Sequence, residues 1–150
     1  MRINEIGELL RSKNAALQEY LRALDTALNQ TRGGSYEQCR RALNALRELC
    51  GLLEQEAWQN FRVEETVLYP LLKQRCPELR KSLGRLCEEH EIILQKLKEF
   101  RAELVHFNAN GESRRVQPLG EELASLLRCH GSHEADEILP LLQEYAEKSQ

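Results

Sequence analysis

Apolar residues recur along this chain at alternating steps of three and four residues, and this spacing constrains the fold more than any other feature. The second long segment shows it best, with seam positions at Leu43, Leu46, Cys50, Leu53, Ala57, Asn60, Glu64, Val67 and Leu71. Such steps place successive side chains on one face of an α-helix. A helix with one apolar face buries it against other helices, so the spacing predicts a helical bundle.

Three breaks divide the chain into long helical segments. They lie at residues 31–35, where Ser35 and Gln38 form a capping box, at Cys76-Pro77, and in the polar run 108–113. The predicted helices are 3–30, 36–75, 77–107 and 114–148. Short connections make consecutive helices antiparallel. The sequence therefore predicts one all-α domain over residues 1–150, an antiparallel up-down-up-down four-helix bundle.

An internal repeat relates the two halves of the chain. Residues 60–72 align with residues 130–142 at a shift of 70, which places Glu64 over Glu134 and Pro70 over Pro140. The first and third predicted helices also align. The chain therefore reads as two duplicated helical hairpins. Both prolines lie near a helix end and are expected to remove one backbone hydrogen bond there.

Charge and composition exclude several classes of function. There are 21 basic and 24 acidic residues, and the pI is about 5.9, so no basic surface for nucleic acid is expected. No apolar run approaches the ~20 residues of a membrane span, and the charged start of the chain does not resemble a signal peptide. The five cysteines include no CxxC pair and are expected to be reduced thiols. The sequence predicts a cytoplasmic protein with no membrane or nucleic-acid partner.

Six polar residues occupy seam positions that the spacing reserves for apolar side chains: Asn14, Asn60, Glu64, His90, His130 and Glu134. Burying an ionised carboxylate is costly unless it is paired. His130 and Glu134 share one helix face, and Glu64 and His90 lie at similar distances from the turn at Cys76-Pro77. We expect these four side chains to meet at one level of the bundle. A divalent cation would satisfy them, and a metal-free hydrogen-bonded core is the alternative.

The same residues resemble a known family. The pattern His130-Gly-Ser-His-Glu134 followed by Pro140, the run Glu89-His90-Glu91, and the segment 61–70 are similar to the hemerythrin-like, or HHE cation-binding, family. The resemblance covers nearly the whole chain. It implies a four-helix bundle with a di-iron centre, in which each hairpin supplies one histidine from its first helix and a His-xxx-Glu motif from its second.

The chain departs from that pattern in its first half. His90, His130 and Glu134 match the family's ligands in the second hairpin, whereas the first keeps only Glu64. Asn14 and Asn60 stand where the resemblance calls for histidine, and Leu94 replaces the additional histidine of oxygen-carrying hemerythrins.

An amide oxygen is a weak neutral ligand. We therefore expect one non-haem Fe ion, or Mn or Zn, held by Glu64, His90, His130 and Glu134, with Glu137 or water completing the shell. A dinuclear centre and a metal-free core are the alternatives.

Three functions follow. The resemblance implies a metal-binding protein that carries or senses O2 or NO, stores iron, or responds to stress. The second hypothesis is a metal-free bundle that binds a protein partner. The third, a metal-dependent oxidase, has the least support because the paired Glu-xx-His motifs of ferritin-like oxidases are missing. The sequence therefore favours a protein that is not an enzyme.

The remaining polar residues near the seams are expected to lie outside the cluster. Glu65 and Glu89 are expected to face solvent, and His106 and His133 to lie at the surface or its boundary. Cys87 is expected to pack in the core.

Overall fold

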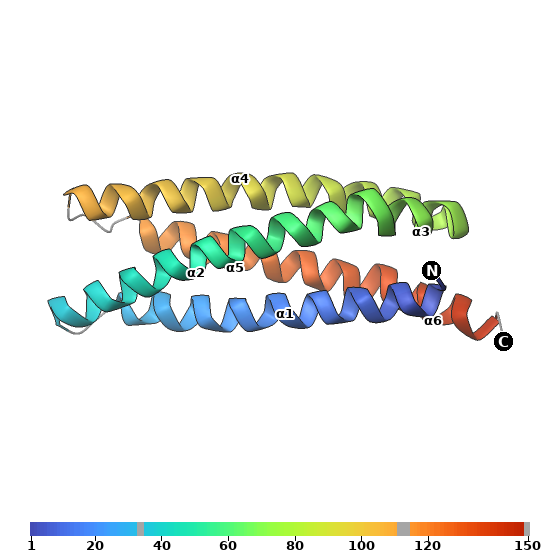
Figure 1. Ribbon diagram of the computed structural model, residues 1–150, viewed down its shortest axis with the longest axis horizontal. Coiled ribbons are helices and arrows are strands. Elements are labelled where there is room, and N and C mark those ends of the chain that lie inside the picture. Colours follow the sequence, from blue (N-terminus) through green and yellow to red (C-terminus); the bar gives the residue numbers. More distant parts are fainter. Residues whose placement is uncertain (33–34, 111–114, 149–150) are drawn as a thin grey trace.

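The computed structural model describes residues 1–32, 35–110 and 115–148, and the regular elements in these ranges are all helical. Four long helices form the molecule (Figure 1): α1 (Ile3–Gln30), α2 (Tyr36–Val63), α4 (Arg80–Asn110) and α5 (Val116–His133). α2 continues through a π-helical segment, η1 (Glu64–Leu68), into α3 (Tyr69–Arg75). α5 continues in the same way through η3 (Glu134–Ile138) into α6 (Leu139–Lys148), and a 3-10 turn, η2 (Pro77–Leu79), precedes α4.

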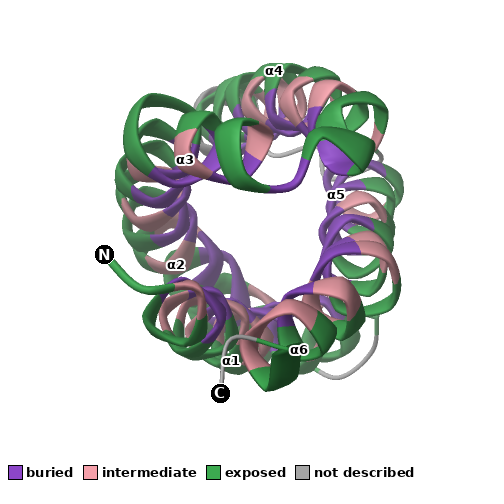
Figure 2. Ribbon diagram, turned by 90° about the vertical axis from the view of Figure 1, so that its right-hand side faces the viewer, coloured by how far each residue is buried: buried purple, intermediate pink, exposed green. Residues whose placement is uncertain are grey.

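The four long helices pack in a ring. α1 contacts α2 and α5, and α4 contacts the same two helices. Consecutive helices run in opposite directions (Figure 1), and an end-on view shows the buried residues on the inner face of each helix (Figure 2). This arrangement confirms the predicted four-helix bundle. Among the described helices, none has the length and apolar character that a membrane span requires.

The predicted boundaries hold at the first two breaks and shift at the third. Ser35 caps α2, because its hydroxyl accepts from the Gln38 N–H while the Gln38 side chain bonds the Ser35 N–H. α4 extends to Asn110, three residues past the predicted end, so the turn expected from residue 108 was placed too early. α5 begins at Val116. Residues 111–113 of the expected turn, and residue 114 at the expected start of the next helix, lie outside the described residues.

Both prolines follow π-helical turns rather than simple kinks. The Tyr69 N–H donates to the Glu64 carbonyl, five residues back, and the Leu139 N–H donates to the carbonyl of Glu134 in the same way. A proline has no N–H to donate and its ring crowds the carbonyl four residues earlier. The wider turn before each proline accommodates both restrictions.

Each π turn inserts one extra residue into the helix and changes which side chains face the core. After η1 the buried positions are Leu68 and Leu72, whereas Val67 is 43% exposed and Leu71 is only partly buried. The expected core positions Val67 and Leu71 were therefore wrong by one residue. The helix before the bulge keeps the predicted phase.

The core consists of two apolar clusters separated along the bundle axis. One contains residues such as Leu28 and Leu104, and the other contains residues such as Ile6 and Leu142. On α4, apolar core positions precede and follow His90. A layer of buried polar side chains therefore interrupts the core, and this layer is the candidate site.

Candidate metal centre

Four buried side chains bring potential metal-ligand atoms to one point of the polar layer. Glu64 is the first residue of η1, Glu134 is the first residue of η3, and His90 and His130 come from α4 and α5. All four are at most 4% exposed, and one ligand atom from each lies within 4.8 Å of the other three. The structure thus brings together the four side chains that the sequence predicted as ligands.

Outer carboxylates orient the two imidazole rings. His90 Nδ1 lies 3.0 Å from Glu65 Oε1, and His130 Nδ1 lies 2.9 Å from Glu89 Oε1. A carboxylate oxygen accepts, so in each pair the proton is on Nδ1, and a neutral ring then directs the lone pair of Nε2 into the cluster. Phe61 holds the ring of His90 by stacking on it, with centroids 3.9 Å apart.

The inner nitrogens and oxygens are crowded. The two Nε2 atoms are 3.2 Å apart, and His90 Nε2 lies 3.0 Å from Glu64 Oε2. His130 Nε2 lies 3.7 Å from Glu134 Oε1. Lone pairs this close repel one another unless a proton or a cation lies between them. The arrangement therefore needs a proton or a cation at its centre.

Tyr69 joins the two carboxylates. Its hydroxyl lies 2.6 Å from Glu64 Oε2 and 2.8 Å from Glu134 Oε1. A phenol has one proton, so a second proton must be shared among these three groups if both contacts are hydrogen bonds. Tyr69 reaches this position because the π turn rotates it inward.

Burial and charge separate the pKa values of these groups. Burial and the neighbouring Glu64 charge raise the pKa of Glu134 well above 4.5. Burial also disfavours the charged form of Glu64. When His90 carries a second proton on Nε2, its hydrogen bond to Glu64 and its charge outweigh burial and lower the pKa of Glu64. Burial and then the two carboxylates raise the pKa of the Tyr69 hydroxyl, and burial lowers the pKa of His130. Without a metal, these opposite shifts favour the proton on Glu134 and the negative charge on Glu64.

The first half of the site is occupied by neutral amides. Asn60 is buried, and its Oδ1 accepts from Lys13 Nζ at 2.9 Å while its Nδ2 donates to Glu56 Oε1 at 3.4 Å. Asn14 is half-buried, and its Oδ1 would lie 3.1 Å from a Cβ added to Gly131. Asn60 therefore points inward as expected, whereas Asn14 is only partly enclosed.

Several outer residues differ from expectation. Glu89 was expected to face solvent, but its side chain is 19% exposed and its second oxygen lies 2.5 Å from His133 Nδ1. Glu65 is exposed, as expected, and in addition accepts from His90. Glu137, which was considered alongside water for the remaining coordination position, forms an ion pair with Arg85 and is absent from the cluster.

The π turn explains the displacement of Glu137, because Ile138 takes the core position instead.

Tyr69 is the inner residue that the sequence reasoning missed. Three–four spacing from Glu64 selects positions 67 and 71 and leaves Tyr69 off the seam. The available signal was Pro70, since a proline inside a helix often accompanies a local change of turn. Glu65 and Glu89 each lie next to a candidate ligand in the sequence, at a position off the apolar seam. The three–four spacing alone therefore predicts that both carboxylates face solvent.

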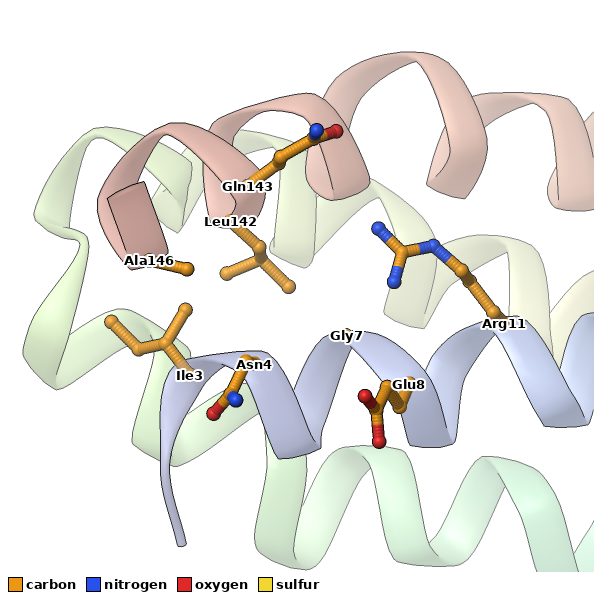
Figure 3. A pocket seen from close by; sticks show the side chains of 8 residues that line it. All are labelled: Ile3, Asn4, Gly7, Glu8, Arg11, Leu142, Gln143 and Ala146. Carbon is orange, nitrogen blue, oxygen red and sulfur yellow. The ribbon is translucent and has the colours of Figure 1, made fainter. Parts of the chain in front are cut away.

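A separate surface pocket lies between α1 and α6 (Figure 3). It has a volume of 230 Å³ and is lined by Ile3, Asn4, Gly7, Glu8, Arg11, Leu142, Gln143 and Ala146. Arg11 and Glu8 place opposite charges on its rim, and none of its lining residues belongs to the buried cluster. The pocket is therefore not an opening onto the four candidate ligands.

The donor set fits a divalent transition metal. Two imidazole nitrogens and two carboxylate oxygens suit Fe, Mn and Zn. The crowding of four ligand atoms around one point, and the outer carboxylates on both rings, are also features of metal sites.

Comparison with known proteins identifies the family. Curated proteins and solved structures gave no match. The family model of the Hemerythrin HHE cation binding domain matches residues 5–142. The match spans most of the chain and includes the four buried candidate ligands, and the fold is the bundle described above. The protein therefore belongs to the hemerythrin HHE cation-binding domain family.

Proposed function

We propose that this protein binds one non-haem iron ion, with Mn or Zn as alternatives, through Glu64, His90, His130 and Glu134. The observation that carries the proposal is the convergence of these four buried ligand atoms within 4.8 Å of one another. A bound cation would replace the proton held between the carboxylates and relieve the repulsion between the two Nε2 atoms.

The asymmetry of the outer residues supports one ion rather than two. In the repeat, Glu89 corresponds to Lys13 and Glu65 corresponds to Ala135. The positions equivalent to Glu89 and Glu65 therefore hold no carboxylate, and Asn60 contacts Glu56 of its own helix instead. Outer-shell partners of metal-bound histidines stabilise the ligand geometry and raise ligand basicity, so this half of the layer lacks both the ligands and their support.

The chemistry of such a centre favours small-molecule binding. A non-haem iron ion with four protein ligands retains coordination positions for water or a diatomic molecule such as O2 or NO. The protein supplies the buried surroundings and the Tyr69 hydroxyl beside the carboxylates. We propose oxygen, nitric oxide or iron sensing as the role, with a stress response as its setting.

Metal analysis of protein purified without a His-tag tests the proposal. We expect about one equivalent of metal per chain. His130→Ala removes a central ligand and is expected to abolish binding. The matched control is His106→Ala, because His106 is exposed and lies on the same helix as His90, about 24 Å along its axis. Wild-type protein that takes up no metal after incubation with Fe(II), Mn(II) or Zn(II) would contradict the proposal.

A metal-free interaction module is the second candidate. The observation that favours it is the closed hydrogen-bond network in which Tyr69 links Glu64 to Glu134 and each imidazole has a carboxylate partner. A polar core satisfied in this way can persist without an ion. Absence of metal uptake together with unchanged stability in chelator would favour this alternative.

A further inference from the structure

Lys13 places a positive charge beside the incomplete half of the polar layer. It lies on α1 next to Asn14, is half-buried, and donates from Nζ to Asn60 Oδ1 at 2.9 Å. In the repeat, Asn60 corresponds to His130 and Lys13 corresponds to Glu89. The Lys13–Asn60 contact is thus the counterpart of the Glu89–His130 contact, with the charge of the outer residue reversed.

We propose that Lys13 restricts the centre to one metal ion by acting as a fixed cation in the incomplete half-site. This inference rests on the proposed function and specifies the number of ions. The ammonium group uses the oxygen of Asn60, which is the atom of that side chain that could ligate a metal. It also repels a divalent cation that approaches the buried Asn60 side chain.

The neighbouring residues are consistent with an ammonium group in place of an ion. Asn60 donates its amide to Glu56, which fixes Oδ1 as the acceptor for Lys13. Gly131 corresponds to Phe61 in the repeat. Phe61 stacks on His90, whereas Gly131 has no side chain and leaves that space to the Asn14 amide. The half-site is therefore packed around neutral amides and one lysine.

The test restores the family's histidines with and without the lysine. We compare Asn14→His/Asn60→His with the same double variant carrying Lys13→Glu, which introduces the residue type of Glu89. Metal per chain is measured by elemental analysis, and the dissociation constant of the second ion by titration calorimetry with Zn(II). We expect the variant that retains Lys13 to bind the second ion about tenfold or more weakly. Lys13→Arg in the double variant is the charge-preserving control and is expected to behave like lysine.

A second pair keeps Asn60 in both members, and the Lys13–Asn60 bond in the member that retains Lys13, and it guards against misfolding of the double variant. Asn14→His is compared with Asn14→His/Lys13→Glu, and circular dichroism verifies that each variant is helical. Equal affinity for the second ion with lysine, arginine and glutamate at position 13 would overturn the inference. This outcome differs from failure of the proposed function, which appears as no metal in the wild-type protein and does not affect the comparison between variants.

Discussion

Ionisation of Glu134 opposes folding of the metal-free protein. Its pKa in the folded state is raised by burial and by Glu64. Stability from such a group is fully present below its unfolded pKa, near 4.5, and is lost as the pH rises through the folded pKa. Glu134→Gln keeps the side chain uncharged at every pH, and its amide can still donate to the Tyr69 oxygen, as the protonated carboxyl group does.

We therefore expect Glu134→Gln to melt at a higher temperature than the wild type at pH 8 in the presence of a chelator. The difference should shrink as the pH falls toward 4.5, where Glu134 is protonated in both folded and unfolded states. Thermal melts between pH 4.5 and pH 8 measure it. A difference that stays constant with pH, or a wild type that is more stable at pH 8, would contradict this reading of the site.

Glu89 is expected to control metal affinity without touching the ion. Its two oxygens accept from His130 and His133. Glutamine at this position can accept with only one of its two terminal atoms, so the orientation of His130 is weakened. We expect Glu89→Gln to lower metal affinity about 10- to 100-fold, as measured by competition with a chromophoric chelator.

Glu88→Gln is the matched control for Glu89, because it removes the same charge from the exposed neighbouring position of α4. Equal effects of the two substitutions would show that net charge, rather than orientation of His130, determines the affinity.

At the scale of helices, the closeness of α5 to its neighbours depends on Gly120. A Cβ at this position would lie 2.5 Å from Leu28 Cδ2 and 3.2 Å from Phe100 Cε2, both on buried side chains of the neighbouring helices. Gly51 in α2 has no neighbour within 4 Å of the same hypothetical atom. The same substitution thus meets a packed core at one position and open space at the other.

We expect Gly51→Ala to stabilise the protein by about 1 kcal/mol, since alanine favours helix. Gly120→Ala is expected to destabilise it by about 1–3 kcal/mol because Leu28 must move within a packed core. Urea denaturation of both variants measures the free energies of unfolding. Stabilisation by both substitutions would show that the contact at Gly120 relaxes without cost.

The helices and the four candidate ligands follow from spacing, and the differences between prediction and structure begin at the π turns. Up to Glu64 and Glu134 the three–four pattern identifies the inward side chains. Past these residues each helix contains one extra residue, so Leu68 and Ile138 are buried while Val67 and Glu137 move away from the core position. Spacing assumes an uninterrupted α-helix and cannot anticipate this rotation, which also brings Tyr69 to the site.

The side-chain contacts between helices could not be predicted from the three–four spacing for a different reason. Glu89, Lys13 and Glu65 occupy flanking positions whose role depends on which residue the adjacent helix presents. The repeat could have indicated their correspondence, because Lys13 aligns with Glu89. The direction of each side chain, however, is set by partners 25 to 47 residues away in the sequence.

For the whole molecule, the polar layer connects metal binding to the stability of the bundle. The ligands come from η1, which continues α2, from α4, and from α5 with its continuation η3. An ion bound by all four would therefore join three of the four long helices. Such a site exists only in the folded state, and its binding free energy therefore adds to the free energy of unfolding.

We expect metal-loaded protein to melt about 5 to 10 °C above protein treated with excess chelator, since an ion at 100 times its dissociation constant stabilises by about 2.7 kcal/mol. Differential scanning calorimetry measures the shift. His130→Ala should melt at one temperature with or without chelator, because it lacks a central ligand, while His106→Ala should retain the full shift. A wild-type protein whose melting temperature is unaffected by either metal or chelator would instead assign the buried histidines and glutamates to a hydrogen-bonded core, in which protons alone balance the two carboxylates.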